Sequence, residues 1–173
     1  GAEYLSALAK DSASDPALAL EAAKGFVNLA KVQSRDLADA KAQAALLQRA
    51  LALIAQAAAN GADPATRIRL ELTARTELSG VLVNAGEVQA ASAQRASAVA
   101  LARASANYSA SESMQLARAD ALIEAARLGA VNVPSAERWA LAQEALAINR
   151  ELAQRSLAAD LRAEVDDKRA ITT

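Results

Sequence analysis

The chain has 173 residues, enough for one domain with a continuous core, and it is 53% hydrophobic but only 2% aromatic. Its 19 basic and 20 acidic side chains are interleaved and leave a net charge of −1, so the basic stripe of a nucleic-acid-binding protein is missing. The chain has no histidine and no cysteine, which excludes disulfides, thiolate chemistry, imidazole catalysis and the usual zinc ligands. No apolar run reaches the roughly 20 residues that span a bilayer, so we expect no membrane insertion, no nucleic-acid partner and no cofactor.

The chain opens on a short helical segment, followed by the start signal of a longer helix. Residues 3–10 place their large apolar side chains on one side of a short lead helix. Asp15-Pro16 then predicts a helix start, because Asp accepts from unpaired N–H groups and Pro is tolerated at the first helical position. After a turn at residues 34–36, the stretch 37–59 predicts the partner helix. Asn60-Gly61 ends it, because glycine readily adopts the left-handed conformation found at helix ends.

Two more pairs of helices follow the same plan. Asp63-Pro64 repeats the start signal, residues 84–86 end that helix, and residues 87 to about 106 form its partner. Ser111 caps the next helix, and the last helix runs from Pro134 towards Lys168. The apolar stripes predicted for the first helices of these two pairs are Leu70, Ala74, Leu78, Val81 and Ala85, and Leu116, Ala119, Ile123 and Ala126.

A short phrase recurs in the second helix of each pair. Residues 48–53 read QRALAL, residues 94–99 read QRASAV and residues 143–148 read QEALAI, at intervals of 46 and 49 (94 − 48 and 143 − 94). Such a period is typical of stacked helical hairpins, each of which buries its apolar face only against a neighbour. We therefore predict an all-α single domain over residues 1–173, with repeats at approximately 15–60, 63–108 and 111–168.

The hairpins resemble tetratricopeptide-type repeats in two features. Their first helices end on small residues before a tight turn, as in NLAKV at residues 28–32 and NAGEV at residues 84–88, and their second helices carry the alanine-rich phrase. The intervals exceed the roughly 34 residues usual in that family, and Phe26 is the one aromatic residue in an obvious place. The resemblance implies a right-handed superhelical array of about three antiparallel hairpins, with the short lead helix at the N-terminus.

A narrower resemblance covers the first third of the chain. EYLSALA at residues 3–9, DPAL at 15–18 and FVNLAKVQ at 26–33 are similar to a region of bacterial receptor-type serine/threonine protein kinases. In that family the region begins a C-terminal helical-repeat sensor, often after a membrane-spanning helix, although the family's usual Gly-Asp turn is replaced here at residues 34–36. The resemblance implies a regulatory or sensor part of a larger bacterial signalling protein, extracytoplasmic if it follows such a helix and otherwise cytoplasmic.

Kinase activity itself is not expected from these residues. The sequence has neither the Gly-rich phosphate loop nor the His-Arg-Asp loop of a kinase catalytic domain. Gly1 opens directly into a helical pattern, which indicates a fragment of a longer protein.

Polar side chains on the first helices are the candidates for a binding groove. In solenoids of this kind the first helix of each hairpin lines the concave groove in which ligands bind. Arg and Asn there would bind a carboxylate or an acidic peptide segment through paired hydrogen bonds, although any single one is more often simply solvated. The residues predicted to line this groove are Lys24, Asn28, Arg67, Arg75, Asn84, Arg118 and Arg127.

Other residue types have a structural and a functional interpretation. For Trp139, core packing between repeats is the favoured interpretation, and a role as a binding hot spot is the alternative. For the hydroxyl cluster of Ser109, Ser111 and Ser113, helix capping is the favoured interpretation and phosphorylation is the alternative. Solvated helix surfaces are favoured over metal or acid–base sites for the close carboxylates, which are Asp36 with Asp39, Asp120 with Glu124, and Asp166 with Asp167.

These features predict a non-catalytic protein–protein interaction or scaffold module whose partner is a protein or a peptide. A self-associating structural domain is the alternative, because alanine-rich helices approach closely and would form a homodimer. A small-molecule sensor or enzyme is the third possibility, and the absence of His and Cys disfavours it.

Overall fold

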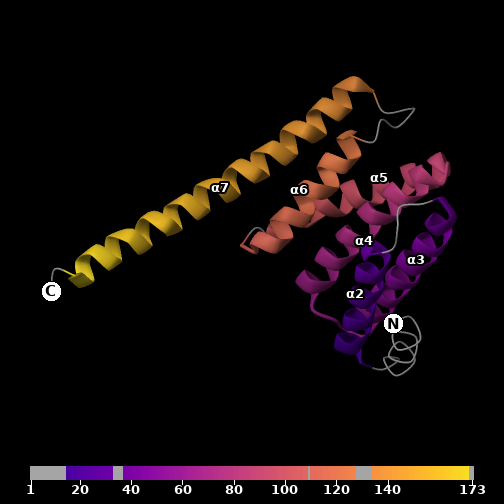
Figure 1. The fold of residues 1–173 in the computed structure, drawn as a ribbon, viewed down its shortest axis with the longest axis horizontal. Helices are drawn as coiled ribbons and strands as arrows, with labels where there is room; N and C mark the ends of the chain where they lie inside the picture. The colour runs from indigo at the N-terminus through magenta and orange to yellow at the C-terminus, as the bar shows by residue number, and fades with distance from the viewer. Residues whose placement is uncertain (1–14, 33–36, 109, 128–133, 172–173) are drawn as a thin grey trace.

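A computed structural model describes residues 15–32, 37–108, 110–127 and 134–171, and the side chains within these ranges except 37–39, 157 and 159–171. The described chain forms α2 (Pro16–Val32), α3 (Leu37–Ala59), α4 (Pro64–Asn84), α5 (Val88–Ala104), a 3-10 turn η1 (Ala106–Tyr108), α6 (Glu112–Arg127) and α7 (Ser135–Ile171) (Figure 1). No strand occurs in these ranges, so the all-α prediction is confirmed there. The predicted lead helix at 3–10 and turn at 34–36 lie outside the described residues, as do residues 128–133, which precede the predicted helix start at Pro134.

The helix starts recur at a fixed interval. The Asp15 carboxylate accepts from the backbone N–H groups of Ala17 (2.9 Å) and Leu18 (3.1 Å), and the Asp63 carboxylate accepts from that of Thr66 (2.8 Å). The Ser111 hydroxyl accepts from the Met114 N–H at 3.4 Å. These three capping residues are spaced by 48 residues (63 − 15 and 111 − 63), which is an interval typical of repeated helical hairpins.

The helix ends and turns agree with the local predictions. Gly61 and Gly86 both have φ of +80°, and no non-glycine residue of the described chain has a positive φ. The N–H of Glu87 bonds to the carbonyl of Leu82, which closes the end of α4 in the manner of a Schellman motif. The predicted stops at residues 60–61 and 84–86 are therefore confirmed.

Burial corrects the predicted register of the repeat. On α3, Gln43, Leu47 and Ala50 are buried, and on α5 so are Ala91, Arg95 and Ala98, each 48 positions later. On α7 they are Leu141, Ala145 and Ile148, a further 50 positions on. The intervals of 46 and 49 predicted from the QRALAL phrase are therefore replaced by 48 and 50. An alanine-rich phrase matches itself in more than one register, whereas burial is decided by the neighbouring helix.

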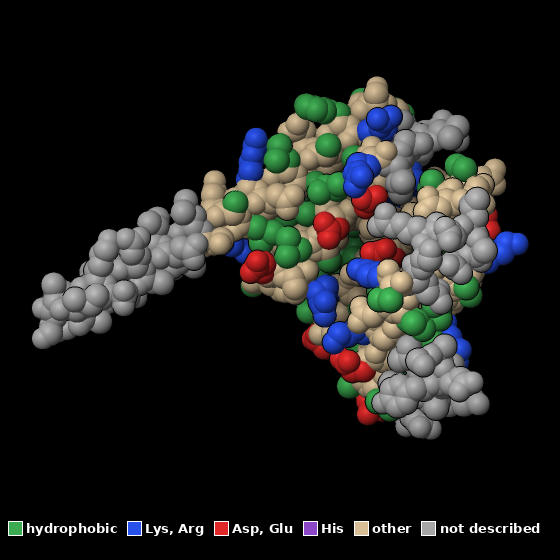
Figure 2. Space-filling view, viewed as in Figure 1, with side chains coloured by type: hydrophobic (Ala, Val, Ile, Leu, Met, Phe, Trp, Pro, Cys, Tyr) green, Lys and Arg blue, Asp and Glu red, His purple; other side chains and the backbone are tan. Residues whose placement is uncertain are grey.

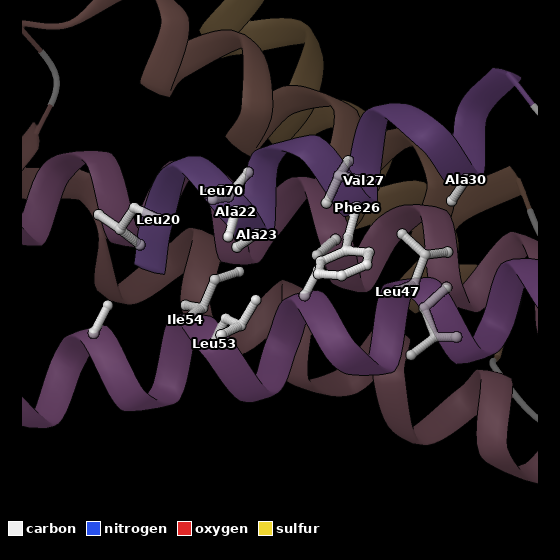
Figure 3. Packing of buried hydrophobic residues seen from close by; sticks show 14 of the residues in the cluster. Leu20, Ala22, Ala23, Phe26, Val27, Ala30, Leu47, Leu53, Ile54 and Leu70 are labelled. Atoms are coloured by element: carbon white, nitrogen blue, oxygen red, sulfur yellow. The ribbon is translucent and has the colours of Figure 1, made fainter. Parts of the chain in front are cut away.

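The core consists of two apolar clusters that share α4 and α5. The first joins α2, α3 and α4 with Ala91 of α5, and Figure 3 shows the Phe26 ring of α2 pointing toward α3 beside Leu47. The second joins α5, α6 and α7 with Ile68 and Leu72 of α4. Leu70, Leu78 and Leu82 of the same helix belong to the first cluster, so α4 is apolar on two sides. The neighbouring helices stack in chain order, and α7 continues past the start of α6 (Figure 1).

The apolar stripe predicted for α6 is only partly correct. Ala119 is buried and Ile123 and Ala126 are half-buried, but Leu116 is 46% exposed. The buried side of α6 instead carries Met114, Gln115, Arg118, Ala119, Ala121, Leu122 and Ala125. Two polar residues therefore occupy core positions, while a leucine predicted to be in the core lies at the surface. The handedness and the tetratricopeptide-like curvature of the array stay predictions.

The Asp63 cap gives a pH-dependent test of this architecture. Hydrogen bonds from the side chain and then the backbone N–H of Thr66 lower the pKa of Asp63 below its ordinary value. A carboxyl whose pKa falls on folding contributes stability above its unfolded pKa of about 4, and this contribution is lost as the pH falls through the folded value. We expect Asp63→Ala to lower the melting temperature at pH 7 and to have little effect at pH 2, as measured by circular dichroism. An equal loss at both pH values would contradict capping by the ionised carboxylate.

Candidate functional site

A groove of about 720 Å³ lies between α6 and α7. We name it the α6–α7 groove. Its described lining residues are Ile123, Ala126, Arg127, Ser135, Arg138, Trp139, Ala142, Gln143, Ala145, Leu146 and Asn149. Figure 2 shows hydrophobic side chains at the surface formed by α6 and the adjoining part of α7.

Trp139 lies in this groove and not in the core. Its side chain is 67% exposed, so the predicted role as a plug between repeats is wrong. The buried residues nearest to it on α7 begin at Leu141, and Trp139 lies two positions earlier, on a different face of the helix. Burying an exposed indole would remove a large apolar area from water, which is why tryptophan is common at binding hot spots.

Large aliphatic residues extend the apolar surface of the groove. Leu146 follows Trp139 by seven residues, two helical turns, and both residues are exposed on the groove side of α7. On α6, Leu116 and Ile123 are likewise seven residues apart. Leu116 and Leu146 are two of the five large hydrophobic residues that the described chain exposes. This spacing along α7 was present in the sequence, but there it equally fits a buried stripe.

The charge at the groove is positive. Arg127 and Arg138 line it, and none of its described lining residues is acidic. Arg127 donates to Glu124, one turn earlier on α6, at 3.0 Å. Arg138 forms no ion pair with a described residue, so its guanidinium faces solvent. The groove therefore combines an apolar floor with two cationic side chains.

The residues predicted from sequence to line a groove are distributed over three helices. Lys24 and Asn28 are exposed on α2, where Lys24 pairs with Glu21 at 3.6 Å. Asn84 is exposed at the end of α4. Arg127 is the one member of the predicted set in the α6–α7 groove.

Arg67 and Arg75 are already engaged by a carboxylate of their own helix. Glu71 accepts from Arg67 at 3.1 Å and from Arg75 at 2.8 Å, one turn to either side. Arg75 also donates to the side-chain oxygen of Gln94 on α5 at 2.9 Å. Arg75 therefore links α4 to α5, whereas Arg67 is engaged within α4.

Arg118 is buried and caps a neighbouring helix. Its Nε donates to the carbonyl of Ala102 at 2.7 Å, and its Nη1 donates to the side-chain oxygen of Gln115 at 2.6 Å. The Ala102 carbonyl lies in the last turn of α5 and also accepts from the Ser105 hydroxyl at 3.1 Å. A cation at the C-terminal end of a helix is favoured by the helix dipole, so Arg118 has a structural role there.

Arg95 is a buried guanidinium that sequence reasoning missed. Its Nε and Nη1 have no hydrogen-bond partner in the described part of the chain. Burial lowers the pKa of Arg95, and attraction to Glu124 opposes that change. The QRASAV phrase concealed this residue, because the aligned Arg49 is exposed and lies over the Phe26 ring at 5.0 Å.

Ser111, Ser113 and Glu124 have partners among the described side chains. Ser111 caps α6, as predicted, and its hydroxyl lies 3.1 Å from that of Ser113. Asp120 is exposed and Glu124 pairs with Arg127. Among the described residues, no three carboxylates come together in a group that could hold a metal ion. Ser109, Asp36 and the side chains of Asp39, Asp166 and Asp167 lie outside the described part.

None of the helices in the described ranges is both long and apolar enough to cross a membrane. Comparison of the chain with protein-family models, with curated proteins and with solved structures gave no match. The resemblances to tetratricopeptide repeats and to receptor-type kinases therefore stay predictions.

Proposed function

We propose that this chain is a non-catalytic protein-interaction module that binds a protein or peptide segment in the α6–α7 groove. The observation that carries the proposal is the exposure of Trp139 in a groove lined by Leu146 and Ile123. An apolar concavity with a few polar groups at its edge is the usual form of a binding site, and aromatic residues with arginines dominate binding energies at interfaces. Arg138 and Arg127 favour a partner segment that carries negative charge.

The sequence resemblance adds a context to this proposal. A helical-repeat module of this kind would be the regulatory or sensor part of a bacterial signalling protein such as a serine/threonine kinase, with any catalytic activity in another domain. Self-association is the second candidate function, favoured by the same exposed apolar residues, because a second copy would cover them equally well. Sedimentation at several concentrations separates the two, since peptide binding does not require a dimer.

Selection of a random peptide library against the immobilised chain tests the proposal. We expect peptides that bind the chain and lose at least tenfold in affinity on Trp139→Ala, because truncation of a central aromatic anchor typically costs about 2 kcal/mol or more of binding free energy. The same substitution should change the free energy of unfolding by less than about 0.5 kcal/mol, because the side chain is largely exposed.

A matched control uses Val88→Ala, which truncates an exposed apolar residue at the start of α5, away from the groove. Binding by the selected peptides should be unchanged in this variant. Peptides that bind Trp139→Ala and the unaltered chain equally would place the recognition surface elsewhere and refute the assignment of the groove.

A further inference from the structure

We call α2 with α3 the first hairpin, α4 with α5 the second and α6 with α7 the third. A further helix packs on the first and on the second hairpin, whereas the corresponding surface of the third is exposed. Helix α4 packs against both α2 and α3, and helix α6 packs against both α4 and α5. The groove between the paired helices is thus filled by the first helix of the next hairpin. In the described part of the chain, no helix lies in the corresponding position on α6 and α7.

The 48-residue repeat identifies which side chains such a helix covers. Leu20, Ile68 and Leu116 occupy the same position in three successive hairpins, five residues after each capping residue. Leu20 and Ile68 are each 7% exposed, and both belong to apolar clusters that include the following hairpin. Leu116 is 46% exposed. The position is covered on α2 and α4 and exposed on α6, so within the described residues Leu116 is a helix-packing position that no helix covers.

An ion pair between the first and second hairpins indicates the charge that a helix bound to α6 and α7 would carry. Lys31 at the end of α2 pairs with Glu77 of α4 across the hairpin boundary, at 3.1 Å. Two repeats of 48 residues later, the equivalent position is Arg127, whose side chain is 72% exposed at the groove. A helix that lies on α6 and α7 as α4 lies on α2 and α3 would therefore bring a carboxylate to Arg127, with Arg138 as a second cation nearby.

We propose that the α6–α7 groove binds one amphipathic α-helix of a partner protein, in the position that α4 takes on the first hairpin. This inference rests on the proposed function and specifies its ligand. The apolar stripe of the partner helix covers Leu116, Ile123, Trp139 and Leu146, and an acidic residue lies near Arg127 and Arg138. A helical ligand docks through its own apolar side chains at spacings of three, four and seven residues. The apolar residues left accessible on α6 and on α7 recur at seven residues, so they can pack against two turns of such a helix.

A peptide of residues 63–84 is a defined probe, because it contains the α4 helix with its cap, apolar stripe and Glu77. Trp139 is the one tryptophan of the chain, so its fluorescence reports on the groove directly. On titration of the full chain we expect a saturable blue shift of Trp139 emission and a gain in helical circular dichroism. The Glu77→Lys peptide should bind about threefold more weakly, because an ion pair at the edge contributes little. The Leu78→Pro peptide should bind at least tenfold more weakly, because proline breaks the helix.

Substitutions in the chain locate the binding and separate the two proposals. Leu146→Asp should weaken the peptide at least tenfold, whereas Val88→Asp, exposed on α5, should leave its affinity unchanged. Absence of a Trp139 response, or equal binding of the parent and Leu78→Pro peptides, would overturn the helix proposal. If the library selection still returned groove-dependent peptides that bind in an extended form, the interaction function would stand and only its helical ligand would be wrong. A blue shift that rises with the concentration of the chain alone and disappears in Leu146→Asp would assign the groove to a second copy.

Discussion

Phe26→Ala is expected to lower the free energy of unfolding by about 3–5 kcal/mol, the usual cost of removing a buried phenylalanine. Phe26 is the one phenylalanine of the chain and is fully buried beside Leu47 (Figure 3), in a cluster that also contains Ile54 and several alanines. Alanine neighbours are too short to move into the vacated volume, so the cavity remains. The variant also loses the contact of the Arg49 guanidinium with the ring.

Urea denaturation followed by circular dichroism measures the Phe26 effect, and Trp139 fluorescence reports separately on the third hairpin. We expect the helical signal to begin its transition at lower urea than the fluorescence, because the first cluster weakens while the second keeps its contacts. Phe26→Leu is the control, since it keeps most of the buried area, and it should cost about 1 kcal/mol. A loss below about 1 kcal/mol for the alanine variant would contradict the central position of this ring.

Arg95→Leu is expected to stabilise the chain by about 1–3 kcal/mol, the range seen when buried charges are replaced by apolar residues of similar size. Arg95 occupies the position that Leu47 fills on α3, 48 residues earlier, and leucine is fully buried there. The guanidinium leaves two nitrogens without hydrogen bonds among the described residues, and its attraction to Glu124 recovers only part of the desolvation cost.

The same substitution at Arg103 is the control for Arg95. Arg103 is an exposed arginine of the same helix, paired with Glu144 of α7 at 3.0 Å, so Arg103→Leu should be neutral or lose up to about 1 kcal/mol. Burial lowers the pKa of Arg95, and a base whose pKa falls on folding destabilises the folded state at every pH below that value. The gain from Arg95→Leu should therefore be equal at pH 6 and pH 8 in chemical denaturation. A loss of stability in this variant would show that Arg95 has a partner that compensates its burial.

Local chemistry explains which parts of the fold were predictable from the sequence. The Asp63-Pro64 start and the Gly61 and Gly86 ends depend on residues within one turn of each other, so the sequence alone determines them. The direction in which each helix faces depends on the neighbouring helices. Because alanine occurs on every side of α5 and α6, several apolar stripes are compatible with the same sequence.

The candidate site was the least predictable feature for the same reason. Arg118 was assigned to a groove from its position on a first helix, whereas the structure buries it against the end of α5. Core packing is predicted for Trp139 from its position at a helix start, between Arg138 and Leu141, whereas the structure exposes it. Each error concerns which face of a helix is buried. That face is decided by the neighbouring helices and not by the residues of the helix itself.

The position of α4 between two apolar clusters has a consequence for communication along the chain. Ile68 and Leu72 contact the cluster of α6 and α7, while Leu70 and Leu78 contact that of α2 and α3. Because α4 packs against both clusters, a shift of α4 toward one cluster moves it away from the other. Occupation of the α6–α7 groove would thus act on the N-terminal hairpin through a displacement of α4, with Ala91 of α5 as a second contact to the first cluster.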